Sequence, residues 1–136
     1  MLRCLIVDDS PLFLDAARGL LEREGVTVVG VASTGSDAIQ RIRELRPDVT
    51  LLDIGLGTES GFEVARRIQR ETGPRPSPVI LVSTHGEQDF ADLIAASPVL
   101  GFLSKAALSA SAVREMLETK RDLGGSSPQV NEPPGT

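Results

Sequence analysis

Acidic, hydroxyl and basic side chains directly follow short apolar runs of this sequence. Asp8 and Asp9 follow the first run, and Asp53 ends the third. Ser83 follows the fourth run, and Lys105 lies two residues beyond the fifth. Carboxylate and hydroxyl oxygens beside an ammonium group can hold a divalent cation and a phosphoryl group together. These residues are therefore the candidates for chemistry, provided that folding brings them to one place.

The three carboxylates set the chemistry that we expect there. If they shared one cleft, they could not all stay ionised without a compensating positive charge. Lys105 would offset one of them, and a divalent cation would offset the others. Hard oxygen ligands select Mg²⁺ or a similar ion, which often acts together with a phosphate. A carboxylate beside Mg²⁺ and a lysine is a nucleophile toward a phosphoryl group, and the product would be an aspartyl phosphate.

The apolar runs alternate with longer amphipathic segments, which predicts strands that are each followed by a helix. The predicted strands span residues 2–7, 26–31, 49–53, 79–82 and 99–103. Apolar residues recur at helical spacing within residues 12–21, 38–45, 64–68, 90–94 and 113–117. Strands that are apolar without alternation fit burial on both faces, so we expect an α/β fold with an open, doubly wound parallel sheet. Ligands of such sheets bind outside the carboxyl ends of the strands, where the candidate residues lie.

Length and charge exclude several classes of protein. The chain has 136 residues and a mass of 14.4 kDa, which is enough for one domain with its own core. Its 14 Lys and Arg residues against 19 Asp and Glu residues give a net charge of -5, which argues against binding a nucleic-acid backbone. No apolar stretch approaches the roughly 18 residues of a membrane span. The first residues show no leader, so the expected location is the cytoplasm.

Composition changes at residue 124, and this sets the expected domain boundary. Residues 1–123 carry the predicted strands and helices, whereas residues 124–136 are Gly, Pro and Ser-rich with a single charge. That composition predicts a flexible tail. The tail is either a natural end or a linker to a further domain, and the sequence leaves both readings open.

The candidate residues lie in motifs that resemble the receiver domain of two-component response regulators. The matching motifs follow the family's order at residues 5–9, 46–48, 51–54, 61, 82–83 and 101–105. With the helices at either end, the resemblance covers about residues 1–123, and the ordered set is far more specific than any one motif. The resemblance implies a flavodoxin-like parallel sheet of five strands in the order 2-1-3-4-5, with five helices.

The resemblance also implies a role for each candidate residue. Asp53 matches the phosphoacceptor, and Lys105 matches the lysine that binds the phosphoryl group. Asp8 and Asp9 match the acidic pair that holds Mg²⁺, with Asp9 the more direct ligand, and the backbone carbonyl of Gly55 matches a further ligand. The implied function is a phosphorylation-controlled switch rather than an enzyme. The implied phosphoryl donor is a histidine kinase or a histidine phosphotransfer protein.

Other positions match the parts of the family that respond to the phosphoryl group. Ser83 matches the hydroxyl residue that turns toward it, and Phe102 matches the aromatic residue that then swings inward. Gly55, Thr84 and His85 fall at positions that modulate the lifetime of the phosphoryl group. The resemblance implies that the face of the fourth helix, fifth strand and fifth helix then changes its contact with a downstream protein or with a second copy of the chain.

Three residues depart from the family's pattern. Gly57 stands four residues after Asp53, where Pro is common, and predicts a more mobile loop. Ala106 follows Lys105 in place of a Pro that often has a cis bond. Because a non-proline cis bond costs about 2.5–4 kcal/mol, we expect a trans bond here. The branched side chain of Thr84, where Ala or Gly is common, would hinder access to the phosphoryl group.

Three other functions compete with this interpretation. The chain would be the receiver portion of a DNA-binding transcriptional regulator if the tail led to an output domain absent from this sequence, which the mass of the native protein would reveal. A phosphohydrolase similar to the haloacid dehalogenases is disfavoured, because Gly55 stands where those enzymes place a second Asp. A degenerate receiver that binds partners without phosphorylation is disfavoured, because every key group is present.

Overall fold

The computed structural model describes residues 1–125 of the chain. Of the predicted tail, residues 126–136 lie outside the described part. Gly124 and Gly125 belong to the last helix, which therefore ends two residues beyond the boundary expected at residue 123.

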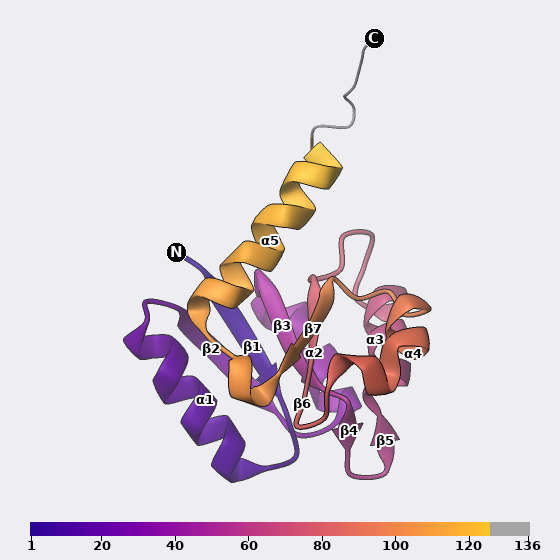
Figure 1. Ribbon diagram of the computed structural model, residues 1–136, viewed down its shortest axis with the longest axis horizontal. Helices are drawn as coiled ribbons and strands as arrows, with labels where there is room; N and C mark the ends of the chain where they lie inside the picture. The colour runs from indigo at the N-terminus through magenta and orange to yellow at the C-terminus, as the bar shows by residue number, and fades with distance from the viewer. Residues whose placement is uncertain (126–136) are drawn as a thin grey trace, which may run out of the picture.

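Five parallel strands form the central sheet in the order β2-β1-β3-β6-β7, which confirms the predicted order of the main strands (Figure 1). Their bounds are Arg3–Val7 for β1, Thr27–Ala32 for β2, Val49–Asp53 for β3, Val79–Ser83 for β6 and Gly101–Ser104 for β7. Every residue of β3 and β6 is buried, as expected for strands covered on both faces. Because all the pairings are parallel, the carboxyl ends of the strands share one edge of the sheet.

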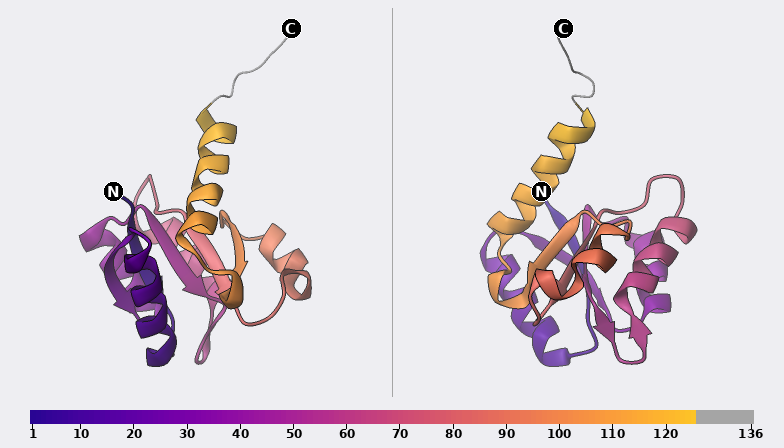
Figure 2. Two further views of the ribbon diagram at one scale, coloured as in Figure 1. Left: turned by 60° about the vertical axis from the view of Figure 1, so that its left-hand side comes forward. Right: turned by 45° about the vertical axis from the view of Figure 1, so that its right-hand side comes forward.

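Within residues 1–125, five α-helices cover the two faces of the sheet (Figure 2). They are α1 (Pro11–Arg23), α2 (Gly35–Leu45), α3 (Gly61–Glu71), α4 (Ala91–Ala95) and α5 (Ala110–Gly125). Leu5 packs into the core under α2 and α3, whereas its neighbour Ile6 packs into the core under α1 and α5. This alternation is the geometry of a strand buried on both faces. Within the described residues, every helix falls short of the length and hydrophobicity needed to span a bilayer.

Serine side chains cap α1 and α3, the first α-helices after β1 and β3. The Ser10 hydroxyl accepts a hydrogen bond from the Phe13 N–H at the start of α1. The Ser60 hydroxyl accepts one from the Phe62 N–H at the start of α3. Each such cap stabilises its helix by about 1 kcal/mol. These caps also fix the course of the chain shortly after β1 and β3.

Some details depart from the expected pattern of strand and helix. Gly55–Leu56 (β4) and Glu59–Ser60 (β5) pair as a small antiparallel hairpin between β3 and α3, where a mobile loop is predicted. Short 3-10 turns precede α4 at Glu87–Phe90 (η1) and follow β7 at Lys105–Ala107 (η2). The peptide bonds of the described residues are all trans, including the one between Lys105 and Ala106, as predicted.

Candidate functional site

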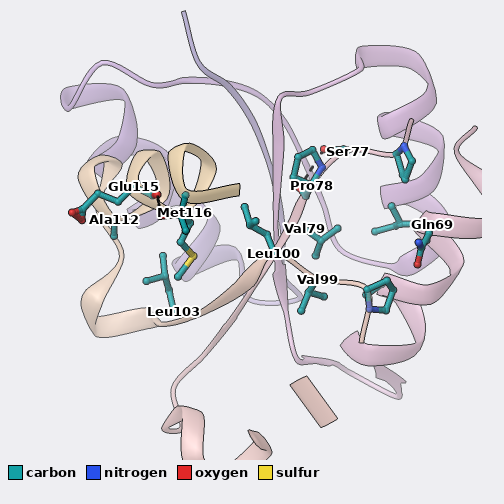
Figure 3. Close-up of a pocket in the computed structure, with 15 residues that line it drawn as sticks. Gln69, Ser77, Pro78, Val79, Val99, Leu100, Leu103, Ala112, Glu115 and Met116 are labelled. Carbon is teal, nitrogen blue, oxygen red and sulfur yellow. Dashed lines mark hydrogen bonds between the residues drawn. The ribbon is translucent and has the colours of Figure 1, made fainter. Parts of the chain in front are cut away.

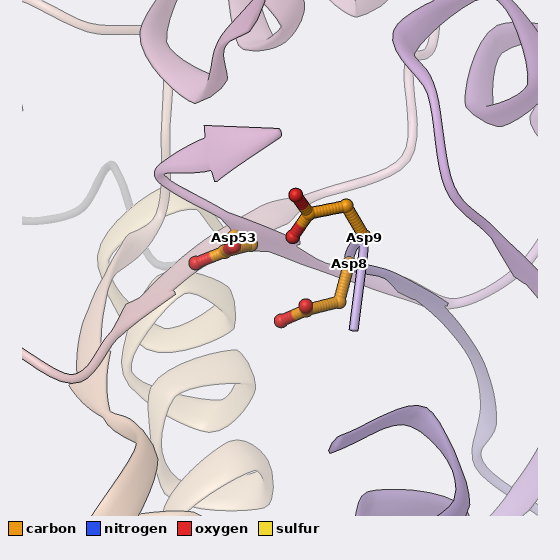
Figure 4. A group of neighbouring side chains, drawn as sticks. All are labelled: Asp8, Asp9 and Asp53. Atoms are coloured by element: carbon orange, nitrogen blue, oxygen red, sulfur yellow. The ribbon is translucent and has the colours of Figure 1, made fainter. Parts of the chain in front are cut away.

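Asp8, Asp9 and Asp53 converge at the carboxyl edge of the sheet (Figure 4). β1 and β3 are neighbours and Val7 pairs with Leu52, so the residues that follow, Asp8 and Asp53, emerge side by side. One carboxylate oxygen from each of the three aspartates lies within 4.8 Å of the others. Asp8 is fully buried, Asp53 is 9% exposed and Asp9 is exposed. The cluster is therefore closed at Asp8 and open to solvent at Asp9.

Lys105 reaches the same edge from the end of β7. Its Nζ lies 2.7 Å from Asp8 Oδ2 and 3.7 Å from Asp53 Oδ1. Within residues 1–125, Asp8 Oδ2 has this ion pair and no further hydrogen-bond donor. Asp8 Oδ1 accepts a hydrogen bond from the Ser10 N–H at 2.8 Å. Both oxygens of the buried carboxylate are thus held, and the ammonium compensates its charge.

Burial and the neighbouring carboxylates raise the pKa of Asp53 to about 6, from an ordinary value of 3.8. Burial is the largest cause and the carboxylate of Asp8 is the next. Lys105 lowers the pKa, Asp9 raises it, and a hydrogen bond from the Gly55 backbone lowers it. The raising effects prevail, so burial and the nearby carboxylates together disfavour the ionised form of Asp53.

A divalent cation fits this set of donors. Asp9 and Asp53 offer carboxylate oxygens on the open side, and such hard ligands suit Mg²⁺. A cation there would offset the charge of Asp8 and Asp9, which contributes, after burial, to the raised pKa of Asp53. Gly55 borders the cluster with open space around it, since a Cβ at this residue would meet no atom within 4 Å.

The raised pKa of Asp53 predicts how stability depends on pH when no metal is present. The folded state binds more protons than the unfolded state between about pH 4 and pH 6, so the free energy of unfolding falls as the pH rises through this window. Asp53→Asn removes that fall, and we expect the variant to be about 2–3 kcal/mol more stable than the wild type at about pH 8. Urea unfolding in a chelator at about pH 4 and pH 8 measures the difference. Asp15→Asn, on the exposed surface of α1, is the control, and equal behaviour of the two variants would contradict the prediction.

Ser83 ends β6 beside the acidic cluster, because its neighbour Val82 pairs with Asp53. Ser83 is 5% exposed, and its hydroxyl accepts a hydrogen bond from the His85 N–H at 3.0 Å. The same Oγ lies 3.4 Å from His85 Nδ1. Thr84, between them, is exposed. The sequence prediction that these residues share the edge with Asp53 agrees with this geometry, and their roles stay predictions.

Phe102 lies inside the molecule. It is 7% exposed and belongs to the core under α2 and α3. Two aromatic residues that the sequence did not assign to the site extend from His85. The rings of His85 and Phe90 pack perpendicular to one another at 5.9 Å between centroids, and the centroids of Phe90 and Phe62 are 6.1 Å apart. No motif marks this group, since its members lie on separate elements.

The first turn of α1 departs in part from what helical spacing predicts. Leu12 belongs to the apolar pattern of the helix, yet it is 83% exposed. Phe13 packs against the core as the pattern predicts, and its ring also lies under the Lys105 ammonium, a contact that the pattern does not indicate.

An apolar groove of about 800 Å³ lies away from these residues, between α3 and α5 (Figure 3). Pro78 and Leu100, which precede β6 and β7, line it together with Met116 of α5. It therefore opens at the amino ends of these strands, and none of the predicted site residues lines it.

Comparison with known proteins gives one family. A model of the response regulator receiver domain matches residues 4–118. A putative transcriptional regulator of Pseudomonas aeruginosa is 36% identical over 105 residues, which are 77% of this chain and 50% of that protein. A protein-glutamate methylesterase/protein-glutamine glutaminase of Syntrophus aciditrophicus is 39% identical over 84 residues, which are 61% of this chain and 23% of that protein. The chain thus spans half or less of the length of these curated relatives.

Solved structures show the same architecture. The signal receiver domain of the putative response regulator NarL from Mycobacterium tuberculosis is 30% identical, with a TM-score of 0.74 over 88% of this chain and 96% of that one. The response regulator domain of Thermotoga maritima CheB is 24% identical, with a TM-score of 0.68 over 96% and 98% of the two chains, and it shares the fold.

Proposed function

The chain belongs to the family of response regulator receiver domains, and from this membership we propose that it is a signalling switch controlled by phosphorylation of Asp53. One observation carries the proposal. A mostly buried carboxylate at the end of β3 lies beside an exposed carboxylate and 3.7 Å from the Lys105 ammonium. This arrangement combines a nucleophile with the positive charge that a phosphoryl group requires.

In the proposed reaction the chain supplies the nucleophile and the charge. A carboxylate oxygen of Asp53 attacks the phosphorus of a phosphohistidine on a histidine kinase or histidine phosphotransfer protein. The bond from phosphorus to the imidazole nitrogen breaks, and the imidazole leaves with the electron pair. Lys105 would neutralise charge on the transferring oxygens. The chain is thus modified by the reaction and has no other substrate of its own.

Magnesium is the cofactor that we propose. Asp9, Asp53 and the backbone carbonyl of Gly55 would hold it, and Asp8 would support the set from its buried position. When bound, the ion would neutralise negative charge on the phosphoryl group and on the carboxylates. The same ion would favour the ionised, nucleophilic form of Asp53.

The phosphoryl group would act on the rest of the molecule through Ser83 and Phe102. We propose that the Ser83 hydroxyl turns toward the phosphoryl group and that Phe102 responds to this movement. Gly55, Thr84 and His85 would set the lifetime of the phosphoryl group. The face of α4, β7 and α5, where Leu93 is 48% exposed, would then change its contact with a downstream protein or a second copy of the chain.

The proposed location is the cytoplasm, without contact between this chain and nucleic acid.

Incubation with acetyl phosphate tests the proposal directly. We expect the intact mass of the protein to increase by one phosphoryl group when both acetyl phosphate and Mg²⁺ are present. We expect no increase with a chelator or in Asp53→Asn. Asp37→Asn, an exposed carboxylate at the start of α2, is the control and should be phosphorylated like the wild type. An unmodified wild type, or a modified Asp53→Asn, would contradict the proposal.

A second candidate is the receiver portion of a transcriptional regulator. The Pseudomonas aeruginosa relative is named a putative transcriptional regulator, and this chain covers 50% of its length. Residues 124–136 would then be the linker to a DNA-binding domain. The mass of the protein isolated from its source distinguishes the candidates, since a mass near 14.4 kDa contradicts this one.

A further inference from the structure

The Lys105 ammonium has an aromatic partner besides the two carboxylates. Its Nζ lies over the ring of Phe13, 4.2 Å from the ring centroid. An aromatic face attracts a cation because the ring carries negative charge density above and below its plane. We propose that Phe13 is a positioning residue that keeps the Lys105 ammonium beside the acidic cluster, within reach of Asp53. This inference rests on the function proposed above.

The loop that carries Asp8 also fixes Phe13. Asp8 Oδ1 accepts from the Ser10 N–H at 2.8 Å, and the Ser10 hydroxyl accepts from the Phe13 N–H at 3.3 Å. Asp8 Oδ2 and the Phe13 ring then both contact the ammonium of Lys105. The four residues thus hold one another in place, so Lys105 cannot move away from the cluster without losing its contacts with both the carboxylate and the ring.

A phenyl ring suits this place because it attracts the ammonium without using its hydrogen bonds. An ammonium has three donors. Its Nζ forms an ion pair with Asp8 Oδ2 at 2.7 Å, whereas Asp53 Oδ1 at 3.7 Å lies beyond hydrogen-bond length. Contact with the ring leaves the donors free to turn to phosphoryl oxygens on Asp53. The Lys105 side chain is only 17% exposed, and attraction to a ring is stronger where water is partly excluded.

Packing alone is the competing explanation for Phe13. The residue is partly buried and lies against the core under α1 and α5. Truncation to alanine would disturb both packing and the ammonium, so it cannot separate the two roles. Leucine keeps a large apolar side chain without the ring, and tyrosine keeps the ring face. These two variants therefore form the matched pair.

The first test measures the rate of phosphorylation at low acetyl phosphate concentration with Mg²⁺. We expect Phe13→Leu to slow it about 3- to 10-fold and Phe13→Tyr to restore it to within about 2-fold of the wild type. In a Lys105→Met background, Phe13→Leu should change the rate by less than about 2-fold, because no ammonium remains to be positioned. An equal loss in both backgrounds, or a Tyr variant as slow as the Leu variant, would overturn the inference.

The second test needs no phosphoryl transfer. The sequence holds two lysines, Lys105 and Lys120, so lysine-selective labelling yields two sets of side-chain NMR signals, and Lys105→Met assigns them. The ε-protons of Lys105 should be shielded by the ring in the wild type and in Phe13→Tyr, and should lose this shielding in Phe13→Leu. Unshifted Lys105 signals in the wild type would overturn the inference. A wild type with shielded signals that acetyl phosphate fails to modify would instead contradict the proposed function.

Discussion

Replacing Lys105 with methionine is expected to lower the free energy of unfolding by about 3–5 kcal/mol when no divalent cation is present. Methionine keeps most of the apolar stem but removes the ammonium, which lies 2.7 Å from Asp8 Oδ2. The Asp8 carboxylate is fully buried, so its charge would be left without a partner. Removing one member of a buried ion pair is costly for this reason. Urea unfolding in a chelator at about pH 8 measures the loss.

Two further variants separate this cause from a general loss of positive charge. Arg18→Met removes a cation from an ion pair with Glu22 whose side chains are 46% and 48% exposed. Such exposed pairs contribute little, and we expect a loss of at most about 0.5 kcal/mol. Asp8→Asn combined with Lys105→Met removes the buried charge itself and should recover most of the stability. A loss below about 1 kcal/mol for Lys105→Met, or no recovery in the double variant, would contradict the charge balance described here.

The edge of the sheet was predictable because parallel strands place their ends together. Asp8, Asp53 and Lys105 are far apart in the sequence, yet each lies at or just after the end of a short apolar run that is typical of a strand in a covered parallel sheet. Once the runs are identified as parallel strands, the residues after them must share one edge. This prediction of a shared edge did not depend on how the helices pack, so it holds even though the first turn of α1 was not predicted in detail.

Details within the first turn of α1 were beyond prediction. Helical spacing treats Leu12 and Phe13 as core residues, but spacing does not reveal where the helix extends past the face of the sheet. At that point Leu12 is exposed to solvent and Phe13 meets a cation. The contact between ring and ammonium depends on the height of α1 above the edge of the sheet, which is a property of the tertiary structure.

The β4–β5 hairpin was missed for a different reason. Its strands have two residues each, too short for any periodic pattern. A tertiary hydrogen bond supports it, since Glu59 Oε1 accepts from the Gly35 N–H at the start of α2 at 2.9 Å. The partners are 24 residues apart in sequence, so local propensity carries no signal of this bond. The loop after Asp53 is thereby tied to α2, whatever flexibility Gly57 lends it.

Gly61→Ala is expected to destabilise the protein by about 3 kcal/mol and to slow phosphorylation of Asp53 at least about tenfold. A Cβ at this position would overlap the backbone oxygen of Asp53 and would lie 2.7 Å from the Cα of Ile54. These are backbone atoms, which cannot turn aside as the end of a side chain can. The start of α3 or the end of β3 must therefore move. Urea unfolding measures the first effect, and the rate of mass increase with acetyl phosphate measures the second.

Gly55→Ala is the matched control for stability, because it adds the same methyl group to β4, a few residues before Gly61. A Cβ at Gly55 would meet no atom within 4 Å, so we expect a change within about 0.5 kcal/mol. Gly61 does not have the positive φ of Gly25, Gly57 and Gly73, so its requirement for glycine is one of space. The close approach of α3 to the end of β3 then explains why a glycine stands eight residues after Asp53. If Gly61→Ala were as stable as Gly55→Ala, this contact would not be what holds Asp53 in position.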